Sequence, residues 1–211
     1  MTANNPVCRA GVLMVSLCLP LSVLAAAPLV VASIAPLHSL VATVMQGVGS
    51  PHLLLRGGES PHTFTLRPSD ARLLHAADVL FWIGPPLELP LQRILPGLED
   101  IDTVAMLDVP GVETLAARDL QPAHAVEPAH VHAVDPHIWL SPANAMAMGD
   151  AIARTLAVTD PANAAQYGKN AALWRQQLTL LDQDLRFELS GIEGGVAVFH
   201  DAYQYLEQRY G

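Results

Sequence analysis

Short apolar runs alternate with segments of helical periodicity over the first half of the chain, and this alternation restricts the fold more than any other feature. Four runs have the length and apolar character of buried strands, at residues 28–34, 52–55, 78–84 and 102–107. Helical patterns separate these runs, at residues 36–45, 69–77 and 86–95. Ser69 is expected to cap the second helix, and Pro90 to break the third. Strands and helices in alternation are typical of a parallel sheet covered by helices, so the sequence predicts an α/β lobe.

A proline-rich stretch interrupts the alternation at residues 108–136. It contains four prolines and little periodicity, which predicts a long surface loop. A further helix is expected at residues 142–158. The first lobe would then span residues 26–158.

The apolar residues of the next segment recur on one helical face, in steps of four and three. They are Tyr167, Ala171, Trp174, Leu178, Leu181 and Leu185. A helix of this length spans roughly 40 Å, more than a crossover between strands needs, so we predict a rigid linker helix within residues 159–193. Residues 196–200 are then expected to form a buried strand and residues 201–210 a helix. Residues 194–211 would thus begin a second, similar α/β lobe.

The first 25 residues have the anatomy of a secretory signal peptide. Arg9 precedes an apolar run at residues 11–24, and Ala25 offers a small residue for cleavage. The run is shorter than the roughly 20 residues that span a bilayer, although an uncleaved membrane anchor is the alternative. Cys8 and Cys18 both lie in this segment, so the mature chain would hold no thiol for a disulfide or a metal. The sequence therefore predicts an exported protein.

Charge and motifs exclude several classes of ligand. Hydrophobic residues make up 51% of the chain, enough for a sizeable core, and the formal net charge is −9. An acidic chain without basic runs argues against nucleic acid, whose phosphates attract clustered lysine and arginine. No G-x-G-x-x-G or phosphate-loop pattern occurs in the sequence, so a nucleotide site has no support. The acidic balance is compatible with a cation as the ligand.

Three histidines follow predicted strands, where α/β proteins place their ligands. His62 and His137 lie beyond the second and fourth of these strands, and His200 closes the terminal one. Each alone is readily explained as a surface or core histidine. Together, three neutral imidazoles that converge on one point would form a good zinc site.

A second group of histidines, His124, His130 and His132, lies in the proline-rich loop. Histidine-rich tracts of exported proteins can gather metal ions loosely, which makes these residues candidate auxiliary ligands. The alternative is a solvated loop that happens to contain histidine.

Three motifs, SPHTFTLRPSD, DPHIWLSP and VFHDAYQYLEQRYG, occur in this order. Together with the histidine-containing loop and the long helix, they resemble the zinc-binding periplasmic components of bacterial ABC importers, over residues 30–211. The resemblance implies two α/β lobes joined by one rigid helix, with the metal in the cleft between them. It implies zinc ligation by His62 and His137 from the first lobe and by His200 from the second. Most of that second lobe would then be missing from this chain.

The resemblance also implies a function. We expect high-affinity capture of Zn(II) in the periplasm and delivery to an inner-membrane ABC permease, by a protein that is a monomer when full length. Manganese-binding relatives have a carboxylate in place of the third histidine, and an imidazole there favours zinc over cations that prefer oxygen. Some relatives have a glutamate directly before the first ligand, where this chain has Pro61. The fourth ligand is therefore expected to be water, Glu59 or a group of the missing lobe.

Other functions are compatible with a histidine site of this kind. A zinc hydrolase would use three histidines and an open position for water, but no H-E-x-x-H or G-x-S-x-G motif occurs in the sequence, which argues against an enzyme. A manganese or other divalent-metal protein or an adhesin of the same fold is an alternative. A truncated, non-functional remnant is another.

Overall fold

The computed structural model describes residues 26–211 except 99, 119–133, 193, 196 and 199. The predicted signal peptide, residues 1–25, lies outside the described residues. Within the described ranges, no helix combines the length and the apolar character that crossing a membrane requires.

Four parallel strands form a single sheet. In chain order they are β1 (Val30–Ala32), β2 (His52–Leu53), β3 (Val79–Trp82) and β4 (Asp102–Ala105), and their order across the sheet is β2-β1-β3-β4. In the register of the sheet, Val31 lies opposite both His52 of β2 and Leu80 of β3. The central strands β1 and β3 are buried along their whole length, which explains why both are continuous apolar runs. The predicted α/β class with a parallel sheet is confirmed.

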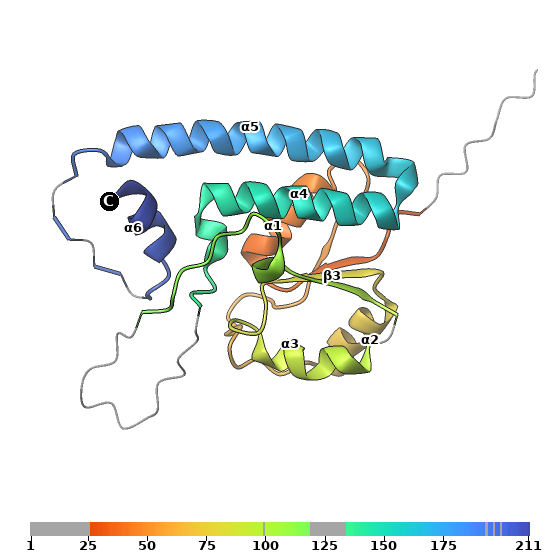
Figure 1. Cartoon of the computed structure of the whole chain (residues 1–211). Coiled ribbons are helices and arrows are strands. Elements are labelled where there is room, and N and C mark those ends of the chain that lie inside the picture. Colours follow the sequence, from red (N-terminus) through yellow and green to blue (C-terminus); the bar gives the residue numbers. More distant parts are fainter. Residues whose placement is uncertain (1–25, 99, 119–133, 193, 196, 199) are drawn as a thin grey trace, which may run out of the picture.

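Helices cover both faces of the sheet (Figure 1). On one face lie α1 (Ala35–Val44) and α4 (Pro142–Thr159), and on the other lie α2 (Pro68–Ala76) and α3 (Leu89–Ile94). Helix α1 turns one apolar face towards the interior, with buried residues three or four positions apart: Leu37, Leu40, Val41 and Val44. Because helices occupy both faces, the strand ends are where a ligand can approach the sheet.

Two predicted features of the helices are wrong. Helix α2 begins at Pro68 rather than after Ser69, and the carboxylate of Asp70 accepts the Arg67 backbone N–H at 3.0 Å in its first turn. Pro90 does not break α3, because it lies in the first turn, where the N–H that proline lacks would have no helical partner. In both helices a proline therefore marks the start.

The longest helix, α5 (Ala164–Leu189), lies along α4 on the side away from the sheet (Figure 1). Its 26 residues correspond to about 39 Å at 1.5 Å per residue. The predicted apolar face is buried as far as Leu178, at Tyr167, Ala171 and Leu178. Beyond Leu178 this face is more exposed to solvent, and Leu181 is 47% exposed. A long helix is present where the periodicity predicted one, but the described residues cover only part of its apolar face.

The chain departs from the prediction at residues 196–200. Of these, Ala197, Val198 and His200 are described, and none of the three belongs to a strand. A strand needs a neighbour for its backbone hydrogen bonds, and neither edge of the described sheet pairs with this segment. A helix does follow, α6 (Gln204–Tyr210), but it begins three residues later than predicted. Of the strand and the helix expected within residues 194–211, the described residues therefore form only the helix.

One carboxylate fastens α6 to α5. Asp182 of α5 accepts hydrogen bonds from the Arg209 guanidinium at 2.7 Å and from the Tyr210 hydroxyl at 2.8 Å. These donors, Arg209 above all, hold the pKa of Asp182 well below its usual range. The carboxylate is therefore charged at neutral pH and retains both donors of the last turn of α6.

A buried glutamate joins the ends of the two central strands. Glu88 is fully buried and accepts a hydrogen bond from the Ser33 hydroxyl, directly after β1. It also accepts the backbone N–H groups of Ile83 at 3.0 Å and Gly84 at 2.9 Å, directly after β3. Burial raises the pKa of Glu88 to about 7, although the three donors oppose the shift. Glu88 thus fixes the carboxyl ends of β1 and β3 relative to each other.

We predict that replacing Glu88 by glutamine removes a pH dependence from the free energy of unfolding. The folded wild type holds the Glu88 proton more tightly than the unfolded chain does, with a pKa of about 7 against 4.5. Stability is therefore complete below the lower value and falls as pH rises through the higher one, by roughly 3 kcal/mol at 1.36 kcal/mol per pKa unit. In E88Q the amide oxygen still accepts the Ile83 and Gly84 N–H groups, and the amide N–H can donate to Ser33.

Chemical denaturation at about pH 5 and about pH 8 checks this prediction. The wild type should lose stability between the two conditions, and E88Q should lose clearly less. Equal losses in the two proteins would show that Glu88 is not the group responsible.

Candidate metal centre

A cavity of about 520 Å³ opens at the carboxyl ends of the strands. Its wall includes Ile34 after β1, residues 55–62 after β2 and Leu87 after β3. The chain leaves the adjacent strands β1 and β3 towards opposite edges of the sheet, and α/β proteins bind ligands at such a switch point. The three predicted zinc ligands, His62, His137 and His200, all line this cavity.

Asp135 holds His137 in a fixed orientation. Its carboxylate Oδ1 accepts hydrogen bonds from the His137 backbone N–H at 2.9 Å and from ring Nδ1 at 2.7 Å. Aspartate favours such turns, and Pro136 between the two residues restricts the backbone further. Both residues are buried, with 5% of Asp135 and 8% of His137 exposed. Because a carboxylate only accepts hydrogen bonds, Nδ1 carries the ring proton and Nε2 presents its lone pair.

His200 meets His137 through the ring nitrogens that a metal would bind. Their Nε2 atoms lie 3.2 Å apart, and the ring planes are inclined at 73°. Since Nε2 of His137 carries the lone pair, Nε2–H of His200 is the donor in this contact. Two residues that are 63 positions apart in the sequence thus direct ring nitrogens at one point.

The loop after β2 places two further candidates on the cavity wall. His62 lies in a turn at residues 61–63 and is half-buried. Glu59 forms an ion pair with Arg67 at 2.6 Å, at the start of α2. Among the residues that the structure describes, no three histidine, cysteine, aspartate or glutamate side chains are grouped closely enough to hold a metal ion. The structure therefore brings His137 and His200 together, and it places His62 and Glu59 beside them without closing a third ligand position.

The candidate auxiliary ligands His124, His130 and His132 lie outside the described residues. The flanks of that segment are described, and they meet beside the site. The backbone N–H of Asp135 donates to the carbonyl oxygen of Leu115 at 2.8 Å. Leu115, four residues before the undescribed segment, and Asp135, two residues after it, are therefore bonded to each other beside His137.

Three residues at the site were not predicted from the sequence. Asp135 had a signal that was overlooked, since a carboxylate two residues before an imidazole can reach its ring nitrogen. Trp139 packs edge-on against His137, with ring centroids 5.3 Å apart and an interplanar angle of 64°. Tyr205 of α6 hydrogen-bonds the carbonyl of Asp135 at 2.8 Å, a contact between distant segments that no local pattern indicates.

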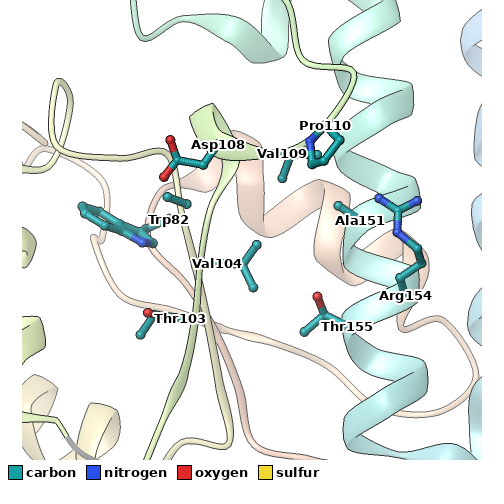
Figure 2. A pocket seen from close by; sticks show the side chains of 10 residues that line it. Trp82, Thr103, Val104, Asp108, Val109, Pro110, Ala151, Arg154 and Thr155 are labelled. Carbon is teal, nitrogen blue, oxygen red and sulfur yellow. The ribbon is translucent and has the colours of Figure 1, made fainter.

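A second hollow, of about 460 Å³, lies between β4 and α4 (Figure 2). Figure 2 shows Asp108 beyond the end of β4 and Arg154 on α4, on opposite sides of this hollow. No histidine occurs among the described residues that line it, and Asp108 is its single carboxylate there. The cavity with the paired imidazoles is therefore the better candidate for a metal site.

Comparison with known families places the chain among zinc-uptake proteins. Residues 30–211 match the family described as "ZnuA: Zinc-uptake complex component A periplasmic". The high-affinity zinc uptake system protein ZnuA of Brucella abortus (strain 2308) is 37% identical over 219 residues, which cover 86% of this chain and 64% of that protein. The protein of the same name from Paracoccus denitrificans (strain Pd 1222) is 36% identical over 212 residues, with 87% and 64% covered. The chain thus spans 64% of the length of these curated relatives.

Solved structures show the same architecture. A crystal structure of ZnuA has a TM-score of 0.75 and 26% identity, over 87% of this chain and 68% of that one. The structure of Zn(II)-bound AdcA from Streptococcus pneumoniae has a TM-score of 0.73 at 23% identity, over 87% of this chain and 38% of that one, and shares the fold. The resemblance carried by the three histidine motifs is confirmed, and the chain belongs to the ZnuA family of periplasmic zinc-uptake components.

Proposed function

We propose that this chain captures Zn(II) in the periplasm and delivers it to an inner-membrane ABC permease, with His62, His137 and His200 as the zinc ligands. The relatives from Brucella and Paracoccus are named for high-affinity zinc uptake. One observation in the chain itself carries the proposal. The Nε2 atoms of His137 and His200 face each other at 3.2 Å.

This separation is close to that of two nitrogen ligands on one zinc ion. Zn–N bonds of about 2.0–2.1 Å at a tetrahedral angle place two nitrogens roughly 3.4 Å apart. The distance between the two nitrogens therefore has to increase by only about 0.2 Å, while the rings turn their lone pairs towards an ion that lies off the line between them. Zinc would take the place of the proton between them, because imidazole binds a metal through a deprotonated nitrogen.

We propose that His62 completes the three-histidine set through a movement of its loop. This loop contains Gly57 and Gly58, and Gly58 adopts a φ of +94°, a conformation that glycine accommodates without strain. The fourth position would hold water or Glu59. Releasing Glu59 from Arg67 costs little, because exposed ion pairs contribute only about 0–1 kcal/mol.

The chemistry of the cavity favours capture over catalysis. A hydrolytic zinc enzyme needs a general base beside its metal-bound water. Asp135 is occupied by two N–H groups of His137, and Glu59 is held either by Arg67 or, in the proposed site, by the ion itself. Imidazole ligands also favour zinc over manganese, which prefers oxygen. We therefore infer a binding protein that is a monomer when full length and that hands its ion to the permease.

Replacing His62, His137 or His200 by alanine should each weaken zinc binding by about 100-fold or more. Loss of a ligand should exceed the 10–100-fold effect that is usual for residues which only support ligands. Competition titration against a chelator of known zinc affinity measures this. H75A is the matched control, since His75 lies on the surface of α2, and its affinity should equal that of the wild type.

The triple variant H124A/H130A/H132A tests the auxiliary histidines in the same titration. It should change the number of ions bound or the rate of capture while leaving the tightest affinity within about threefold of the wild type. An equal loss of tight binding in the triple variant and in H137A would place the main site elsewhere.

Replacing Asp135 by asparagine should weaken zinc binding by roughly tenfold. The asparagine oxygen can still accept both N–H groups of His137, but it lacks the charge that makes the imidazole a stronger ligand. D201N is the control, because Asp201 adjoins the other histidine and pairs with Arg118 at 3.6 Å instead of an imidazole. If D135N and D201N bind zinc equally well, Asp135 does not tune the site.

A further inference from the structure

We infer that Tyr205 is a positioning residue of the metal centre: its hydroxyl links the segment that bears His200 to the backbone that carries Asp135 and His137. The inference rests on the proposed function, because it concerns the same pair of imidazoles. It adds a residue that touches neither the ion nor a ligand ring.

The Tyr205 hydroxyl closes a small circuit of hydrogen bonds. It donates to the carbonyl oxygen of Asp135 at 2.8 Å and accepts the backbone N–H of Leu115 at 3.1 Å. The third side of the circuit is the bond from the Asp135 N–H to the Leu115 carbonyl oxygen, at 2.8 Å. Tyr205 is 4% exposed, and burial raises the pKa of its hydroxyl, which therefore keeps its proton and donates at neutral pH. The circuit is thus complete under physiological conditions.

This circuit fixes both the backbone N–H and the backbone carbonyl of Asp135. The N–H of Asp135 is held by Leu115, and its carbonyl is held by Tyr205. The side chain of Asp135 in turn fixes the ring of His137. A displacement of the Tyr205 hydroxyl therefore moves Asp135, and Asp135 in turn moves the ring of His137 with its Nε2 atom.

Tyr205 also lies five residues after His200, in the first turn of α6. Helix α6 lies below the end of α5 and beside the segments that flank residues 119–133 (Figure 1). Gln204 donates to the carbonyl oxygen of Ala116 at 3.0 Å, and Arg118 pairs with both Asp201 and Glu207. Of the α6 side chains that the structure describes, Tyr205 is the one that hydrogen-bonds Asp135. The 3.2 Å separation of the two imidazoles therefore depends on this hydroxyl more than on the other contacts of α6.

The test compares Y205F with Y210F in the full chain. Each variant removes one hydroxyl from α6 and keeps the ring, but the Tyr210 hydroxyl binds Asp182 on α5 and does not contact the site. We expect Y205F to bind zinc about tenfold more weakly than the wild type and Y210F to stay within about twofold, by chelator competition. Equal affinities in Y205F and Y210F would overturn the inference.

A second measurement separates positioning from a general loss of stability. Nitrogen NMR of the metal-free chain reports which ring nitrogen of His137 is protonated. The wild type and Y210F should show the proton on Nδ1, and Y205F should show a mixture of the two forms. An unchanged His137 signal in Y205F, with a lowered midpoint of denaturation, would show a structural role only and would also overturn the inference.

If Y205F does not fold, Q204A replaces it, because the Gln204 side chain donates to the carbonyl oxygen of Ala116, next to the Leu115 that belongs to the circuit. It should show the same two effects more weakly, and their absence would overturn the inference. Failure of the proposed function has a different signature. In that case the wild type and H137A would bind zinc equally, whatever Tyr205 does.

Discussion

All four strands of the sheet run in the same direction, and the candidate site depends on this constraint. Parallel pairing brings the carboxyl ends of the strands to one edge, so the loops that follow them converge there. Glu88 fixes the distance between the ends of β1 and β3, because its carboxylate accepts hydrogen bonds from Ser33 after β1 and from Gly84 after β3. The backbone thus creates the cavity, and the histidines acquire their common position by lying in segments that the topology brings together.

The two paired imidazoles are supported in different ways. His137 is held by a residue two positions earlier, so its orientation is a local property of the segment before α4. No described neighbour in the sequence hydrogen-bonds the ring of His200, so its place depends on how the segment that leads into α6 is held. Near the site, this segment is held by the bond from the Tyr205 hydroxyl to the carbonyl oxygen of Asp135. One half of the centre therefore arises from neighbouring sequence, and the other half from contacts between distant segments.

This difference explains what the sequence could and could not predict. The sheet and the long helix follow from periodicity, which each segment contains on its own. None of the described residues of the segment 196–200 forms the expected strand, because an apolar run has strand composition, whereas strand formation requires a partner. For the same reason, the apolar face of α5 was visible in the spacing up to Leu185, but its exposure at Leu181 was not. The contact between Tyr205 and Asp135 joins segments 70 residues apart and left no trace in either one.

The turn made by Asp135 bears on how an ion leaves the site. An imidazole that is already oriented loses little freedom when an ion arrives, so its contribution to affinity is not offset by ordering. His200 is exposed and His62 lies in a surface turn, so under the proposed function the ion would have to order both. Under the proposed function, such a site would release its ion in steps, with the two adjustable imidazoles leaving first. His137 would then be the last ligand to dissociate, so the order in which the ligands leave the ion would be fixed.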